Sequence, residues 1–184
     1  MTRNTTSRAL HDLGLAAWFG GTLANAVSLN SAAAQADSAS GTGAVANTGW
    51  DRWTPVNAAA IGLHLAGSLG QIGGNAERIA GQRGVGSMAL AKTALTAAAL
   101  GVTAYSRVLG RKVSQHTDVP AESGTQPASG TPDEVAAAQK QLAVLQWVVP
   151  ALTGSLVVVS SFAGEQQRAS EVHKGVLQRI TPGA

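Results

Sequence analysis

His64, Ser68 and Gln71 are the residues of this sequence whose types and spacing are best suited to chemistry. They lie in an apolar stretch, residues 54–74, and a helix that turns about 100° per residue would place all three in one narrow polar stripe with Asn57. His64 stands about midway along the stretch and is its only ionisable residue. An ionisable side chain inside an apolar helix is a candidate for ligand binding or proton transfer. The competing interpretation is structural, because such a side chain often hydrogen-bonds to a neighbouring helix.

Polar side chains on the neighbouring apolar stretches extend this set. If the polar stripes of the first three stretches face one another, Asn25, Trp18, Lys92 and Thr96 join a polar core. Thr103 continues the side of Lys92 and Thr96. Lys92 lies about one turn inside its stretch, so its long stem also allows the ammonium to reach the polar interface. The predicted polar-core or ligand residues are Asn25, His64, Ser68, Gln71, Lys92 and Thr103.

The sequence does not indicate catalysis, a metal or a cofactor. Ser68 and His64 are one turn apart on one helix without an acid to orient the imidazole, so a nucleophilic pair is not indicated. A haem held by two histidines needs them on facing helices at matched depth. We expect no such partner, because His11 lies at the end of the first apolar stretch, and His116 and His173 fall in polar segments. We therefore predict no catalytic residue, no metal and no cofactor.

Small residues form a second helical pattern, which predicts close packing between helices. Gly62, Ala66, Gly70 and Gly74 follow one another at i, i+4 spacing on a face roughly opposite the polar stripe. Such a face lets another backbone approach closely. Gly21 belongs to a similar small-residue face in the first apolar stretch. The edge that suits acyl chains consists of Ile61, Leu65, Leu69 and Ile72.

Composition predicts that these elements lie in a membrane. Hydrophobic residues make up 45% of the chain and charged residues only 12%, well below the charged fraction of about 25% in soluble domains. About 20 apolar residues suffice to cross about 30 Å of hydrocarbon. We therefore predict an all-α fold, a polytopic membrane protein with a bundle of four transmembrane helices in a single domain. The expected spans are about 10–31, 55–74, 88–109 and 141–164.

The segments between the apolar stretches predict loops. Residues 36–53 are rich in Gly, Ser and Ala, and the Thr54-Pro55 pair after them is a typical helix start. Residues 110–131 lack periodicity and contain Pro, Ser, Thr and Gly, so we expect a mobile, disordered loop outside the cytoplasm. Residues 165–184 form a polar tail.

The basic residues indicate membrane topology rather than nucleic-acid binding. The net charge of +3 comes from Lys and Arg residues spread in twos and threes beside the apolar stretches. Four crossings place both termini on one side, which we expect to be the cytoplasm, although Arg107, Arg111 and Lys112 oppose this orientation. Residues 1–36 also have the pattern of a cleavable signal peptide, whereas their small-residue face favours a retained helix.

The run from Leu15 to Thr22, LAAWFGGT, resembles the first span of small four-span bacterial integral membrane proteins of unknown function. An aliphatic-Trp-aliphatic-Gly-Gly stretch recurs in that family, and the Ala- and Gly-rich composition looks actinobacterial. The resemblance implies a four-span topology. The family has no established activity, so it implies no site residues.

We expect a non-enzymatic integral membrane protein that acts by helix–helix association, as an accessory subunit of a membrane complex or as a homo-oligomer. Its partners would then be the lipid bilayer and another membrane protein or a second copy, and not nucleic acid. The alternative is a small transporter or channel-like protein with a polar path lined by Asn25, His64, Gln71 and Thr103. Asp12 and Glu165 mark the ends of spans, and no acidic residue lies inside an apolar stretch, which argues against a proton-coupled or cation transporter.

Overall fold

The computed structural model describes residues 4–116, 119–166, 168, 172 and 176. This part of the chain is mostly helical, which confirms the all-α prediction. Most of the predicted polar tail, residues 165–184, lies outside the described residues. The elements are α1 (Thr5–Ala24), the π-helical turn η1 (Asn25–Leu29), α2 (Asn30–Ala33), α3 (Ala39–Gly74), α4 (Ala76–Gly81), α5 (Val85–Ser114), β1 (Ala121–Ser123), β2 (Gln126–Pro127) and α6 (Asp133–Glu165).

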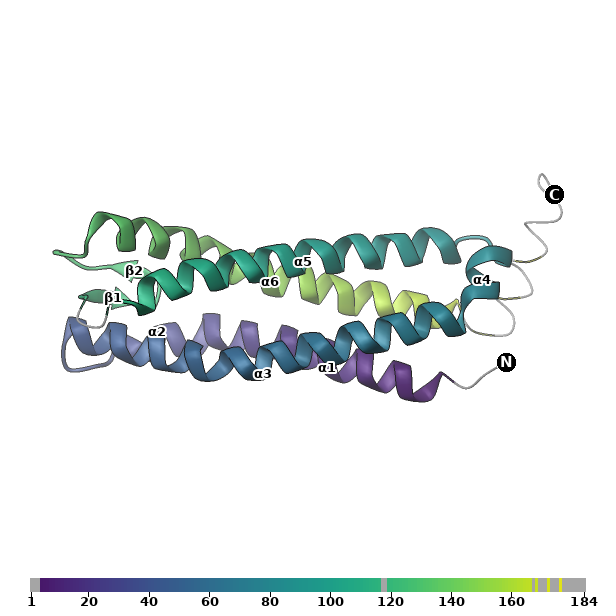
Figure 1. The fold of residues 1–184 in the computed structure, drawn as a ribbon, viewed down its shortest axis with the longest axis horizontal. Helices are drawn as coiled ribbons and strands as arrows, with labels where there is room; N and C mark the ends of the chain where they lie inside the picture. The colour runs from purple at the N-terminus through teal and green to yellow at the C-terminus, as the bar shows by residue number, and fades with distance from the viewer. Residues whose placement is uncertain (1–3, 117–118, 167, 169–171, 173–175, 177–184) are drawn as a thin grey trace.

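The long helices run side by side along one axis (Figure 1). The stretch from α1 through η1 to α2 is followed by α3 running back beside it, and α6 runs back beside α5. α1 also packs against α6, whereas α3 and α5 are in contact over much less of their length. The start of α1 and the end of α6 lie at the same end of the molecule, which we call the terminal end. β1 and β2 lie at the opposite end, which we call the hairpin end.

α3 begins well before Thr54 and Pro55, so the predicted loop over residues 36–53 and the predicted helix start after it are wrong. Ser38 caps the helix, because its Oγ accepts the N–H of Gly41 at 3.1 Å. The Gly- and Ser-rich sequence that follows has a low helix propensity. It packs against α2 and β1, so tertiary contacts decide its conformation.

Residues 119–131 are ordered around a short antiparallel hairpin of β1 and β2. The predicted mobile loop over 110–131 is therefore wrong for the residues that the structure describes; residues 117–118 lie outside them. The Thr131 hydroxyl donates to the Pro120 carbonyl at 2.7 Å, which closes the segment on itself. The hairpin packs on α3 and α6 and covers the hairpin end.

Asn30, the first residue of α2, joins several elements at the hairpin end. Its side chain is buried, its Nδ2 donates to Gln146 Oε1 at 2.6 Å, and its Oδ1 accepts from Trp50 Nε1 at 3.0 Å. Its backbone carbonyl accepts the N–H of Gly124 at 3.4 Å. One residue therefore links α2 to α3, to α6 and to the hairpin.

The packed core midway along the helices is small. Trp18, Ala60, Ala99 and Val149, one from each long helix, form a buried cluster that we call the apolar layer. By length and composition, α5 and α6 are the two described helices able to cross a membrane.

Candidate functional site: a histidine pair and a polar chamber

A short pattern occurs once in α1 and once in α3: His11 is followed three residues later by Gly14, and His64 is followed by Gly67. Each glycine packs against the backbone that carries the histidine of the other helix. A Cβ on Gly14 would overlap the backbone nitrogen of His64, and a Cβ on Gly67 would overlap the backbone nitrogen of His11. Only glycine permits so close an approach. The reciprocal contact fixes α1 against α3 and places the two histidines at the same depth.

The imidazole rings of His11 and His64 are in contact inside the protein. Both residues are 0% exposed, and their ring centroids are 4.6 Å apart, with the Trp18 ring 6.0 Å from that of His64. His11 Nδ1 lies 2.7 Å from Asp12 Oδ1, and His64 Nε2 lies 3.4 Å from Thr96 Oγ1. The expectation that no histidine faces His64 is therefore wrong, because the reciprocal glycine contacts bring His11 to its level.

The geometry of this pair differs from that of a haem or metal centre. In the part of the chain that the structure describes, no group of three His, Asp or Glu side chains is arranged to hold a metal ion. An iron between the two rings would need two metal–nitrogen bonds of about 2 Å in opposite directions. That arrangement requires ring centroids farther apart than the observed 4.6 Å. The observed contact suits packing and hydrogen bonding between α1, α3 and α5.

Beside the histidine pair, towards the terminal end, all four long helices line one polar cavity of about 430 Å³, which we call the chamber. Three polar atoms of its lining residues are buried without a hydrogen-bond partner among the described residues: His11 Nε2, Gln71 Nε2 and Ser160 Oγ. Buried polar atoms are normally paired, so these three are suited to meet water or a ligand. The polar lining consists of Arg8, His11, Asp12, Gln71, Lys92 and Ser160.

A second cavity, of about 390 Å³, lies between α3 and α5, and we call it the groove. Its walls are mainly apolar and include Leu65, Leu69, Ile72, Met88 and Leu100. Gln71, Lys92 and Ala163 line both the groove and the chamber, so the two cavities adjoin.

The predicted polar-core residues divide into two sets on either side of the apolar layer. Thr103 lies on the hairpin side, in a third cavity of about 300 Å³ that Trp53 and Asn57 also line. Asn25 lies in η1, also towards the hairpin end. The set on the terminal side consists of His64, Ser68, Gln71 and Lys92, the last three of which line the groove.

Two of the four small residues predicted to pack on one face of α3 point away from the other described helices. Gly62 and Ala66 are exposed, and a Cβ on Gly62 would meet no atom within 4 Å. The prediction that they lie against another helix is therefore wrong within this chain. The packed face is centred on Ala60, His64 and Gly67, and Gly62 points about 200° away from His64 around the helix.

The other predicted packing glycines do face a neighbouring helix. A Cβ on Gly70 would overlap the side chain of Ser7, and one on Gly21 would overlap the ring of Trp53. Gly74 is equally close to the side chain of Asn4 at the start of α1. These contacts join α1 to α3.

No known protein family, curated protein or solved structure matches the chain. The chamber is therefore interpreted from its own residues. Sequence reasoning missed Arg8, His11 and Ser160. The repeated His-x-x-Gly pattern was a usable signal for His11, whereas Arg8 and Ser160 reach the site only through the packing of α1 and α6.

Proposed function

We propose that the chain is an integral membrane protein and that its four long helices form a four-span bundle. The distribution of polarity supports this placement. Leu69 is 71% exposed and Leu90 is 70% exposed, whereas His11, His64 and Thr153 are completely buried. A soluble protein keeps large apolar side chains inside and polar ones outside. Lipid around the helices suits the reverse arrangement.

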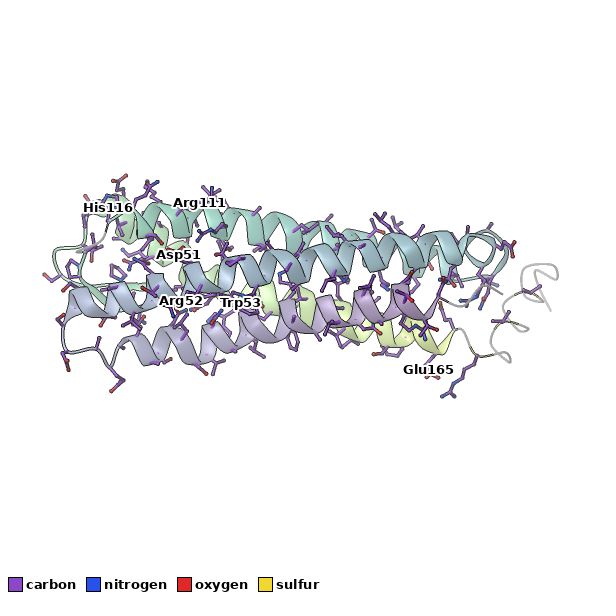
Figure 2. The ribbon with its side chains drawn as sticks, turned by 60° about the horizontal axis from the view of Figure 1, so that its bottom comes forward. Asp51, Arg52, Trp53, Arg111, His116 and Glu165 are labelled. Atoms are coloured by element: carbon purple, nitrogen blue, oxygen red, sulfur yellow. The ribbon has the colours of Figure 1, made fainter. Side chains whose placement is uncertain are left out.

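The positions of the charged residues also support spans in α3 and α6. α3 has no Asp, Glu, Lys or Arg between Arg52 and Glu77, and α6 has none between Lys140 and Glu165. Figure 2 shows Arg52 towards the hairpin end and Glu165 at the terminal end. These uncharged stretches are long enough to cross about 30 Å of hydrocarbon. The charged residues that flank these stretches would then lie at the two membrane surfaces.

α1 and α3 fit this placement although their composition is less apolar than that of α5 and α6. His64 of α3 turns inward, and between residues 56 and 74 the exposed positions of that helix are small or aliphatic. In α1, His11 and Trp18 are fully buried. The contacts of this first helix favour its retention as a span over its removal as a signal peptide.

Within the membrane, we propose a non-enzymatic function by association of α3 with a second membrane helix. The observation that carries this proposal is the exposed small-residue surface of Gly62, Ala66 and Gly73, which we call the outer face of α3. A Cβ on Gly62 or on Gly73 would meet no atom within 4 Å, so no described part of the chain covers this face there. Small residues let a second helix approach closely in lipid. The second helix would belong to another subunit or to another copy of this chain.

Cysteine cross-linking tests this association, because the chain contains no cysteine of its own. We expect Gly62→Cys protein to give a cross-linked dimer under oxidation in native membranes, or a mixed product with a partner under a bifunctional maleimide. Leu90→Cys, on the exposed side of α5, is the matched control and should give little product. Equal products from the two positions, or none from Gly62→Cys, would contradict the proposal.

The alternative function is transport along a polar path. The apolar layer argues against it, because Trp18 and Ala99 lie between the chamber and the cavity that contains Thr103. Rapid labelling of both Gln71→Cys, in the chamber, and Thr103→Cys, beyond the apolar layer, by a membrane-impermeant maleimide added from one side of the membrane would favour a path.

A further inference from the structure

The chamber and the groove are neighbouring cavities with two kinds of surface. Gln71, Lys92 and Ala163 line both, so the two cavities adjoin at these residues. The chamber offers polar and charged groups, whereas the groove offers the side chains of Leu65 and Met88 with other apolar residues. Such a combination suits an amphiphile with a polar head and one apolar tail.

The chamber contains cationic groups that suit an anionic head. Arg8 and Lys92 are the cationic residues and Asp12 is the acidic residue of the described lining. Asp12 Oδ1 already pairs with His11 Nδ1 at 2.7 Å. Across the described chain, the partly buried ammonium of Lys92 makes no hydrogen bond or ion pair. A partly buried charge is costly without a counter-charge, which a bound anion would supply.

Two neutral donors lie in the same chamber. Gln71 Nε2 comes from α3 and Ser160 Oγ from α6, and both atoms are buried without a partner among the residues described. Lys92 comes from α5, so donors from three helices converge on one cavity. A carboxylate only accepts hydrogen bonds and has about four lone-pair positions to offer. The donor set therefore matches a carboxylate.

Arg78, at the far edge of the groove, is already engaged in holding the fold together. Its guanidinium donates to Asn75 Oδ1 at 3.2 Å, to Gln82 Oε1 at 3.0 Å and to the Gln166 carbonyl at 2.8 Å. These bonds join α4 to the end of α6. The charge available to a ligand is that of Lys92, which places the head in the chamber and the tail in the groove.

We propose that the chamber and the groove bind one long-chain fatty acid, with its carboxylate at Lys92, Gln71 and Ser160 and its acyl chain between α3 and α5. Of the three groups proposed to contact the head, only Lys92 is charged, which suits a singly charged carboxylate, and a groove of about 390 Å³ suits one acyl chain rather than two. The inference rests on the proposed membrane placement, because the bilayer supplies such a molecule. It does not depend on association through the outer face of α3.

Binding of radiolabelled oleate to the purified full-length protein in nanodiscs tests the proposal. We expect saturable binding with one oleate per chain. Lys92→Met should weaken it at least tenfold, Lys92→Arg should restore most of it, and Ser160→Ala and Gln71→Leu should each weaken it several-fold. Lys140→Met, which removes an exposed lysine of α6 near the hairpin end, is the matched control and should bind as the wild type does.

Competition identifies the head and the tail that the site recognises. Oleyl alcohol, which lacks the charge, and acetate, which lacks the tail, should displace oleate poorly. Equal displacement by oleyl alcohol, or unchanged binding by Lys92→Met, would overturn the proposal. Stronger displacement by oleoyl lysophosphatidic acid would overturn the proposed carboxylate head and indicate that the site recognises a phosphate head. Gly62→Leu, which alters the outer face of α3, should keep oleate binding, so failure of the association and failure of this site are distinguishable.

Discussion

At the scale of the residue, glycine decides which surfaces of α1 and α3 meet. Gly14 and Gly67 lie where the backbones of the two helices come closest, and each is three residues after a buried histidine. Gly62 is of the same residue type on the same helix but faces away from every described neighbour. The residue type alone therefore does not identify a packing position; the helical phase relative to the partner does.

We predict that Gly67→Ala destabilises the protein and that Gly62→Ala does not. The new Cβ at position 67 would overlap the backbone of α1, which has no side-chain freedom with which to adjust, so α1 and α3 must move apart. Overpacking of this kind costs about 1 to 3 kcal/mol. Thermal unfolding of the two detergent-solubilised variants measures the difference. A larger loss of stability in Gly62→Ala would mean that the packed face of α3 is misassigned.

At the scale of the element, the first part of α3 and the hairpin depend on each other. The Gly- and Ser-rich start of α3 packs against α2 and β1, and neither segment has a strong local preference for its observed structure. Asn30 lies where these elements converge with α6. Its two side-chain hydrogen bonds hold Trp50 and Gln146 in place.

We predict that Asn30→Leu loosens the hairpin end. The substitution leaves the polar groups of Trp50 and Gln146 without this partner, and each buried group left unpaired costs about 1 to 3 kcal/mol. Limited proteolysis in nanodiscs should then cut within residues 119–131, whereas the wild-type hairpin resists. Ser31→Leu is the neighbouring control, because Ser31 is exposed and, among the described residues, its hydroxyl bonds only to the Val27 carbonyl of its own helical stretch. Rapid cutting of the wild type would show that the hairpin is not held in place.

At the scale of the whole molecule, polar and apolar regions alternate along the helix axis. The chamber lies near the terminal end, the apolar layer lies midway, and the cavity with Thr103 lies near the hairpin end. Charged residues mark both ends, and an ion pair of 2.8 Å between Asp51 and Arg107 joins α3 to α5 near the hairpin end. This order is consistent with a membrane whose two surfaces lie at the two ends.

We predict that the hairpin end and the terminal end lie on opposite sides of the membrane, with the terminal end in the cytoplasm. Thr6 and Ser129 are exposed at the two ends, and the chain has no other cysteine to react. A membrane-impermeant maleimide should label Ser129→Cys in intact cells, and Thr6→Cys only after permeabilisation. The reverse pattern would invert the orientation. Labelling of both positions in intact cells would contradict the four-span arrangement.

The sequence by itself determined the helical class and the outward position of Leu69. Both follow from the composition and the 3.6-residue period of a single helix, without reference to its neighbours. The tertiary structure decided which helices meet, at what depth and in which rotation. His11 faces His64 because two glycines on different helices set the register of α1 on α3. The start of α3 and the hairpin take their form from contacts between segments far apart in the chain, which local propensity does not encode. The chamber exists only where four helices converge, so no single stretch of sequence could predict it.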